Sequence, residues 1–403
     1  MLLIHSGYPL WRPGVTDDLP DSYRKVGVSI GDVVAHDGQG GVEYFFNVLY
    51  SSHDDRNLGR VPEDFEPLVL PWDITTALYQ HSPGSVISSA SSKIALQKII
   101  NCRSHDHPHT GVPPEFGCGF FLASGANEGA VLVVPEGSRR EDHRNEDAFE
   151  DYAKKNAMCW FRYINGVRGR RLSGNALILV TGVDKTSNWA MASFNGAETG
   201  FVTMEMVPSP SGAQTKYQFQ QFAQANAHTG PIGTSRLECS SNQSNQCTFL
   251  RGIRAVVGHS RWSSKVSVKT ENVQETSFDA TGGSFVPCGS RASNNQSNSP
   301  SSSPSSKSSS SSFSASLDAA VTTERIPPRD FVYDPCTTVA YYLLEQVPEA
   351  SVVTVRDNHI LGLIQPDDVC LPSDEELLHR MQQRFKIVRE NGRYTSILRA
   401  IND

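Results

Sequence analysis

Long apolar runs, closely paired cysteines and an excess of basic residues are all missing from this sequence of 403 residues. No run reaches the roughly 18–20 consecutive apolar residues that a membrane-spanning helix needs, which excludes an ordinary helical membrane protein. The formal net charge is −7, from 36 Lys+Arg against 43 Asp+Glu, so a generally basic, histone-like surface is also excluded. With 38% hydrophobic residues the chain has enough apolar surface to form a core, which excludes a wholly disordered protein.

Cysteine is scarce as well as scattered. None of the eight cysteines forms the CxxC spacing that is typical of zinc and redox sites. The first residues, MLLIHSGYPLWRPG, lack the basic start and the long apolar core of a secretory signal peptide. We therefore expect reduced thiols and a soluble protein of the cytoplasm.

One segment differs in composition from the rest of the chain. Between residues 289 and 316, 16 of 28 residues are serine, and such a stretch cannot bury enough apolar surface to fold. The sequence therefore predicts a β-rich body over residues 1–288, a disordered linker over 289–316 and a small α+β tail module over 317–403.

The body is predicted to be an α+β fold that is dominated by antiparallel strands, with one or two helices. Short runs of strand-forming residues recur between turn signals, at 26–35, 42–49, 120–124, 130–134, 177–181 and 189–194. The glycine-rich or polar turns between 35 and 42, 124 and 130, and 181 and 189 predict three hairpins.

Apolar residues at helical spacing indicate one helix in the body. The stripe runs from Phe149 to Ile164, Asn145 can cap its start, and Gly166 ends it. A second helix is expected over 89–100.

The tail carries its own signals. Asp334 followed by proline begins one helix, and Ser373 with a glutamate three residues later is the capping box of another. The runs 352–355 and 360–364 predict a hairpin between them.

Two stretches lack acidic residues although the chain is acidic overall. Residues 152–183 contain six Lys or Arg, and residues 239–270 contain five. If the fold joins these stretches, they form a basic face for a phosphate group, nucleic acid or acidic lipid. The predicted anion-binding residues are Arg168, Arg170, Arg171, Arg251 and Arg254. In the alternative interpretation, these arginines pair with carboxylates from elsewhere in the chain.

The segment from Asp184 to Trp189 is the candidate catalytic site. Asp184-Lys185-Thr186 contains parts of two phosphate motifs and completes neither, since no glycine precedes Lys185 as a P-loop requires. As an enzyme on an anionic substrate, the protein would use Asp184 as general acid–base, with Lys185 beside it, and the arginines of the 166–171 turn would hold the substrate. The alternative is a loop that closes a hairpin, with Trp189 as a core anchor.

His105, His107 and His109 alternate along the chain, as metal ligands on one face of a strand do. Pro108 breaks such a strand, so a polar surface loop is the expectation. We predict no metal and no cofactor.

Several motifs occur together along the chain. They are GYPLWRP at 7–13, RKVGVSIGDV at 24–33, WFRYINGVRGR at 160–170, LVTGVDKT at 179–186 and NQCTFLRG at 245–252. With these motifs, nearly the whole chain outside the serine-rich segment resembles a multi-copy family of uncharacterised intracellular proteins of mushroom-forming fungi, the basidiomycetes. The resemblance implies a cytosolic protein with a β-rich body and supplies no activity.

The sequence thus favours a binding or interaction protein that presents a basic face to an anionic partner. The enzyme at the Asp184–Trp189 segment is one alternative. The other is a membrane-active defence protein whose alternating strands near 201–223 and 262–276 insert as hairpins. The oligomeric state is not predicted.

Overall fold

The fold is β-rich, with antiparallel sheets and few helices, which confirms the α+β class. The computed structural model describes residues 6–88, 93–99, 112–170, 172, 177–195, 202–209, 216–231, 244–257, 333–348, 350–365, 368, 371–389 and 396–400. The predicted linker at 289–316 lies outside these residues. All the described residues belong to one compact unit.

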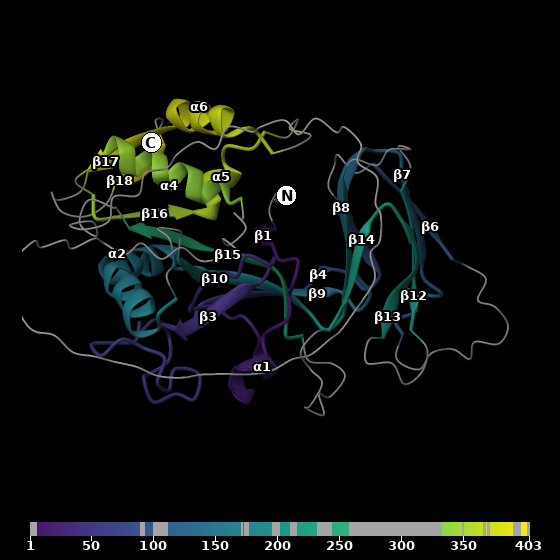
Figure 1. The fold of residues 1–403 in the computed structure, drawn as a ribbon, viewed down its shortest axis with the longest axis horizontal. Coiled ribbons are helices and arrows are strands. Elements are labelled where there is room, and N and C mark those ends of the chain that lie inside the picture. The colour runs from purple at the N-terminus through teal and green to yellow at the C-terminus, as the bar shows by residue number, and fades with distance from the viewer. Residues whose placement is uncertain are drawn as a thin grey trace, which may run out of the picture. The chain divides into compact units, whose positions relative to one another are not determined.

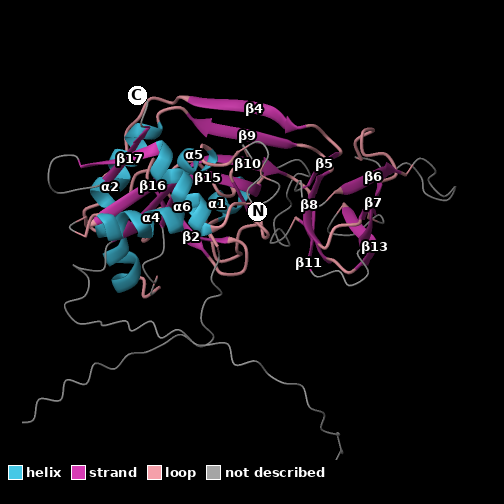
Figure 2. Cartoon of the chain, turned by 90° about the horizontal axis from the view of Figure 1, so that it is seen from above, coloured by secondary structure: helices cyan, strands magenta, loops and turns pink. Residues whose placement is uncertain are grey.

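The largest sheet has eight strands, and its centre is β15, which is buried along nearly its whole length. The order along the sheet is β1 (Tyr8–Pro9), β15 (Gln246–Val257), β10 (Leu177–Thr186), β2 (Asp32–His36) and β3 (Val42–Asn47), with β16 (Val352–Arg356) beside β15, β9 (Ser138–His143) beside β10, and β4 (Ile74–His81) beside β9. Figure 2 shows β4 and β9 lying side by side. Since both faces of β15 are covered, most of its side chains are apolar.

The start of this sheet departs from the sequence prediction. The strand expected over 26–35 begins only at Asp32, because helix α1 (Asp21–Val26) extends to Val26 and residues 27–31 form the connection between them. Gly27 ends α1 with a φ of 71°, and a Cβ at this position would clash with the carbonyl oxygen of Asn245. The hairpin of β2 with β3 is confirmed.

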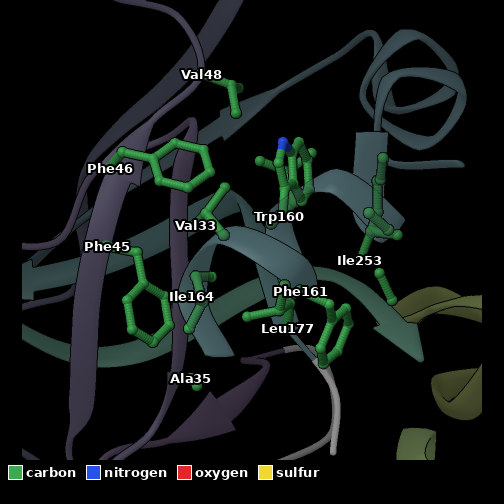
Figure 3. Packing of buried hydrophobic residues seen from close by; sticks show 14 of the residues in the cluster. Val33, Ala35, Phe45, Phe46, Val48, Trp160, Phe161, Ile164, Leu177 and Ile253 are labelled. Atoms are coloured by element: carbon green, nitrogen blue, oxygen red, sulfur yellow. The ribbon is translucent and has the colours of Figure 1, made fainter. Parts of the chain in front are cut away.

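One face of the sheet packs against helix α2 (Glu146–Arg162), as the stripe from Phe149 to Ile164 predicts. Asn145 caps the helix by accepting a hydrogen bond from the backbone of Ala148. Phe46 and Trp160 meet edge to face, with their ring centroids 5.8 Å apart (Figure 3). A π-helical turn, η2 (Tyr163–Val167), continues α2 at its end.

The tail covers the other face of the sheet. Its helices are α4 (Pro335–Gln346), α5 (Asp357–Leu361) and α6 (Asp374–Arg384), followed by the strands β17 (Phe385–Arg389) and β18 (Ser396–Ala400). The first and third helices begin where the sequence predicts, with Asp334 and Ser373 as caps. Figure 1 shows α4 to α6 on the side of β15 and β16 that faces away from α2.

The hairpin predicted from 352–355 with 360–364 is wrong. Strand β16 pairs with β15 instead and leads directly into α5. The Asp357 carboxylate, at the start of α5, accepts a hydrogen bond of 2.7 Å from the backbone N–H of Gly252. The tail residues therefore share a sheet and one compact unit with the body, although the serine-rich segment separates them in the sequence.

A buried arginine lies at this junction between body and tail. The side chain of Arg254, on β15, is 0% exposed, and its Nε donates to Asp334 at 2.6 Å. One Nη atom lies 3.5 Å from Asp357, and the guanidinium lies over the ring of Tyr8 at 5.9 Å. Burial raises the pKa of the Asp334 carboxyl, but the charges and hydrogen bonds of Arg254 and His36 together outweigh burial and lower that pKa. The ion pair therefore stays charged and holds α4 against β15.

We expect Arg254→Met to lower the free energy of unfolding by about 3–5 kcal/mol, because it leaves a buried carboxylate without its cation. Arg170→Met is the matched control. Arg170 pairs with Glu43 at 2.7 Å, but its side chain is 43% exposed, so its loss should cost less than about 1 kcal/mol. Urea denaturation of both variants measures the difference. Equal costs would show that the pair at Arg254 does not hold the tail.

The remaining strands form two four-stranded sheets that pack face to face. One has the order β14 (Asn226–Gly230), β11 (Trp189–Asn195), β8 (Glu128–Val134) and β5 (Ser85–Ser88), and the other has the order β13 (Tyr217–Ala223), β12 (Val202–Pro208), β7 (Phe120–Ser124) and β6 (Ile94–Lys98). The core between them includes Leu122, Val131, Val133 and Met204. Strands β12 and β13 pair as antiparallel neighbours, whereas 262–276 lie outside the described residues.

Two of the predicted hairpins are wrong. Strands β7 and β8 follow each other in sequence but belong to opposite sheets of this sandwich, and β10 and β11 also belong to different sheets. The helix expected over 89–100 is the strand β6 where it is described. Strands β7, β8 and β10 pair instead with β12, β11 and β15, which are distant in sequence.

None of the helices among the described residues is long and apolar enough to cross a membrane. Cys159, Cys247 and Cys336 are free, but Cys118 is disulfide-bonded. The expectation that all thiols are reduced is therefore wrong for Cys118, whose partner cysteine lies outside the described residues.

Thiol titration checks this bond. In denatured protein that is prepared without reductant, we expect at most six of the eight cysteines to react, because one disulfide removes two thiols. Prior reduction should restore eight. Eight reactive thiols before reduction would contradict the bond.

Candidate functional site

The segment from Asp184 to Trp189 is not the loop that the sequence predicts. Strand β10 continues through Thr186, and only Ser187 and Asn188 separate it from β11. Trp189 is fully buried, as expected, and its ring lies directly against Gly230, where a Cβ would clash with it. Asp184 and Lys185 are therefore strand residues in the interior.

Asp184 is enclosed by two arginines. Arg140 binds its carboxylate with two hydrogen bonds of 2.8 Å, and Arg251 approaches it at 2.9 Å. Arg251 also donates to Asp142 at 2.6 Å. Burial lowers the pKa of Arg251, but the two carboxylates outweigh burial and raise it. These groups form a network of ion pairs in which the side chain of Asp184 is 0% exposed.

Lys185 is held in a similar way. Its ammonium donates to the carbonyl oxygen of Val26 at 3.0 Å and to the hydroxyl of Ser29 at 3.4 Å. Burial lowers the pKa of Lys185. The side chain fixes the end of α1 against the sheet.

The predicted anion-binding arginines do not all reach the surface. Arg251 and Arg254 are buried against carboxylates of the chain itself, Arg170 pairs with Glu43, and Arg171 lies outside the described residues. Arg168 is partly exposed. The backbone N–H groups of Arg168 and Arg170 donate to the carbonyl oxygens of Tyr163 and Ile164, the first residues of η2, so these two N–H groups are already paired.

The histidines at 105, 107 and 109 lie outside the described residues. Within the part of the chain that the structure describes, no group of three or more His, Cys, Asp or Glu could hold a metal ion.

A cavity of about 230 Å³ lies against the outer face of the sheet formed by β5, β8, β11 and β14. Its floor follows from the register of that sheet: Met191 pairs with Leu132, and Leu132 pairs with Ile87. Directly paired residues project to the same side, so these three apolar side chains form a continuous row. The run of Val131 to Val134 is apolar throughout because β8 has the sandwich core on one face and this cavity on the other.

The opposite wall comes from the N-terminal segment and from β15. Leu10, Trp11 and Phe249 contribute its apolar surface. The indole ring of Trp11 stacks on His228, at 5.9 Å between centroids and with an interplanar angle of 21°. Burial lowers the pKa of His228, and Arg12 adds to the effect, so the imidazole is neutral at neutral pH. We refer to this space as the Trp11 cavity.

The sequence contains only an indirect signal for the Trp11 cavity. Trp11 lies in the GYPLWRP motif, and the unbroken apolar run of β8 indicates a strand that is covered on both faces. Neither feature reveals which segment covers the outer face. The contact between this face and the segments that cover it brings together Trp11, Leu132, Met191 and Phe249, which come from four separate parts of the chain.

His228 predicts a pH dependence. Because its pKa is lowered by folding, the unfolded chain takes up the proton first as the pH falls below about 6.5, and stability is lost. We expect His228→Phe, which keeps a neutral ring between Trp11 and Trp189, to lose less stability than the wild type between pH 7 and pH 5. Urea denaturation at both pH values measures this, and equal losses would contradict it.

In comparisons with known proteins, no family model, curated protein or solved structure matched this chain. The resemblance to a basidiomycete family therefore stays a prediction.

Proposed function

We propose that this protein binds a small, neutral, mainly apolar molecule in the Trp11 cavity. The proposal rests on one observation: a preformed cavity of about 230 Å³ has aromatic and aliphatic walls and no charged residue among its described lining. Concave apolar sites with a few polar groups are the usual places where proteins bind small molecules.

Size and polarity define the ligand further. An engineered protein cavity of about 150 Å³ holds benzene, so this cavity has room for a molecule of roughly one or two rings. The hydroxyl of Ser193, which lies two residues after Met191 and so on the same face of the sheet, supplies a hydrogen bond for one polar group. A charged ligand would lose its hydration without an ion-pair partner here.

A second candidate function is the binding of an anionic partner, which the sequence favours. Lys155 and Arg162 are exposed on α2, seven residues apart and so on one side of the helix, with Arg168 beyond its end. No ion pair is found for these three among the described residues. These three side chains support a small basic surface. It contains fewer basic residues than the stretches 152–183 and 239–270 have in total.

One binding experiment separates these functions. Saturation-transfer NMR with the full chain would compare neutral 2-naphthol, its charged counterpart 2-naphthoate, and heparin. We expect 2-naphthol to bind and 2-naphthoate to bind at least tenfold more weakly, because the cavity offers no cation. If heparin binds and 2-naphthol does not, the binding of an anionic partner replaces the binding of a neutral apolar ligand as the proposed function.

Two variants test the location of the ligand. Ala130 lies at the edge of the floor, two residues before Leu132 on β8, so Ala130→Leu places three more carbon atoms in the cavity. We expect it to weaken 2-naphthol binding at least tenfold. Ala95→Leu, on an exposed position of β6 in the other sheet, is the matched control and should leave binding unchanged.

A further inference from the structure

A second pocket adjoins the Trp11 cavity on the outer face of the same sheet. It has a volume of about 600 Å³. Its lining includes Glu128, Ala130, Asn195, Tyr333, Leu371 and Asp374. Ala130 also lines the Trp11 cavity, so the two spaces adjoin at this residue. We refer to the second space as the Glu128 pocket.

The register of β8 and β11 explains why the two spaces adjoin. Leu132, Ala130 and Glu128 alternate along β8, so their side chains project from the same face of the sheet. Their paired residues on β11 are Met191, Ser193 and Asn195. Along its length, this face therefore changes from an apolar row, through a row of short side chains, to a polar row.

The middle row leaves the way between the two spaces open. Ala130 and Ser193 pair directly with each other, and both have short side chains. A ligand that lies along this face therefore passes over the row without displacing a large side chain of β8 or β11. Leu132 and Glu128 are four residues apart on β8, and at about 3.3 Å per residue this separates the apolar row from the polar row by about 13 Å. Such a space fits an elongated molecule.

The Glu128 pocket differs from the Trp11 cavity in its charge. Its described lining contains two carboxylates, Glu128 and Asp374, and no basic residue. Both side chains are exposed. Within the part of the chain that the structure describes, no ion pair is found for either of them. The Glu128 pocket is therefore negatively charged, whereas the described lining of the Trp11 cavity carries no charge.

Tyr333 adds an aromatic surface beside these carboxylates. Its hydroxyl donates to Oδ1 of Asp374 at 2.6 Å, and the residue is 40% exposed. Thr338 donates to the same oxygen at 3.3 Å, and no hydrogen bond is found for the other oxygen of Asp374 among the described residues. Burial and the hydrogen bond to Asp374 raise the pKa of Tyr333, so the phenol stays neutral. Carboxylates beside the exposed face of a ring attract an ammonium ion.

From these features we propose that one elongated amine spans both spaces, with its apolar end in the Trp11 cavity and its ammonium group in the Glu128 pocket. The inference rests on the proposed function, because it takes the apolar ligand of the Trp11 cavity as one end of a longer molecule. In the Glu128 pocket the ammonium group stays in contact with water and gains two carboxylates. Inside the Trp11 cavity it would lose its hydration without an ion-pair partner, so the orientation of the ligand is fixed.

A set of naphthyl ligands tests the inference in titrations of the full chain, with naphthyl fluorescence as the signal and all ligands below their micelle concentrations. Naphthyloxy-octylamine, naphthyloxy-octanol and naphthyloxy-octanoate combine the same ring with a cationic, a neutral and an anionic head group. We expect the amine to bind at least tenfold more tightly than the alcohol, because an exposed ion pair strengthens binding by up to about fivefold and two carboxylates act together. The octanoate should bind most weakly.

The length of the ligand is tested separately. Naphthyloxy-ethylamine is too short to reach across about 13 Å, so we expect it to bind no more tightly than naphthyloxy-ethanol. An equal gain for the short and the long amine would show that the ammonium group binds inside or beside the Trp11 cavity, and would overturn the inference.

The same titrations distinguish this inference from the proposed function. If 2-naphthol binds but the long amine binds no better than the long alcohol, the inference is overturned while the proposed function stands. If neither 2-naphthol nor the long amine binds, both fail. If Ala130→Leu leaves the binding of the long amine unchanged, the Glu128 pocket acts alone and the joint site is overturned.

Glu128→Gln locates the ammonium group. The change removes the charge of an exposed side chain and keeps its shape, so the fold should persist. We expect it to weaken binding of the long amine about fivefold and to leave 2-naphthol binding unchanged. Glu345→Gln, at an exposed position of α4 outside the described lining, makes the same change in net charge and should leave both unchanged. Equal losses in the two variants would show a general effect of charge and would contradict the assignment.

Discussion

The burial of β15 on both faces is the constraint on which the rest of this structure depends. Its apolar residues pack against α2 on one side and against the tail helices on the other. The side chain of Arg254 is 0% exposed and that of Arg251 is 12% exposed, so each is paired with carboxylates of the chain itself. Arg251 forms ion pairs with Asp142 and Asp184, while Arg254 forms ion pairs with Asp334 and Asp357. The first set connects β9, β10 and β15, and the second set attaches the tail.

The same constraint explains why Arg251 and Arg254, the described basic residues of the 239–270 stretch, do not contribute to an open basic face. A charged side chain in the interior is stable only when it is paired, so the arginines of a buried strand are neutralised by distant acids. What is left at the surface lies at the end of α2, where cations also suit the negative end of the helix dipole. The Trp11 cavity lies instead where the N-terminal segment and β15 meet the outer face of the sheet formed by β5, β8, β11 and β14.

The sequence predicted the positions of helices and strands better than it predicted which strands pair with each other. Helices α2, α4 and α6 begin at Asn145, Asp334 and Ser373 because capping is a local interaction. The hairpins across 124–130 and 181–189 were wrong because strand pairing is decided by which faces need to be covered, and that depends on distant residues. Asp184 shows the difference most clearly, since its polar neighbours indicated a loop whereas Arg140 and Arg251 make it a stable residue of a buried strand.

By itself, then, the sequence determined the α+β class, the strand-rich body and the local starts of the helices, because periodicity, turn residues and caps act over a few positions. Only the tertiary structure decided that β16 joins the central sheet, that Asp184 and Arg254 are internal ion-pair partners, and that Trp11 and Glu128 line adjoining pockets. Each of these features joins residues that are tens to hundreds of positions apart. Such contacts are selected by burial and charge compensation across the whole fold, and no local pattern records them.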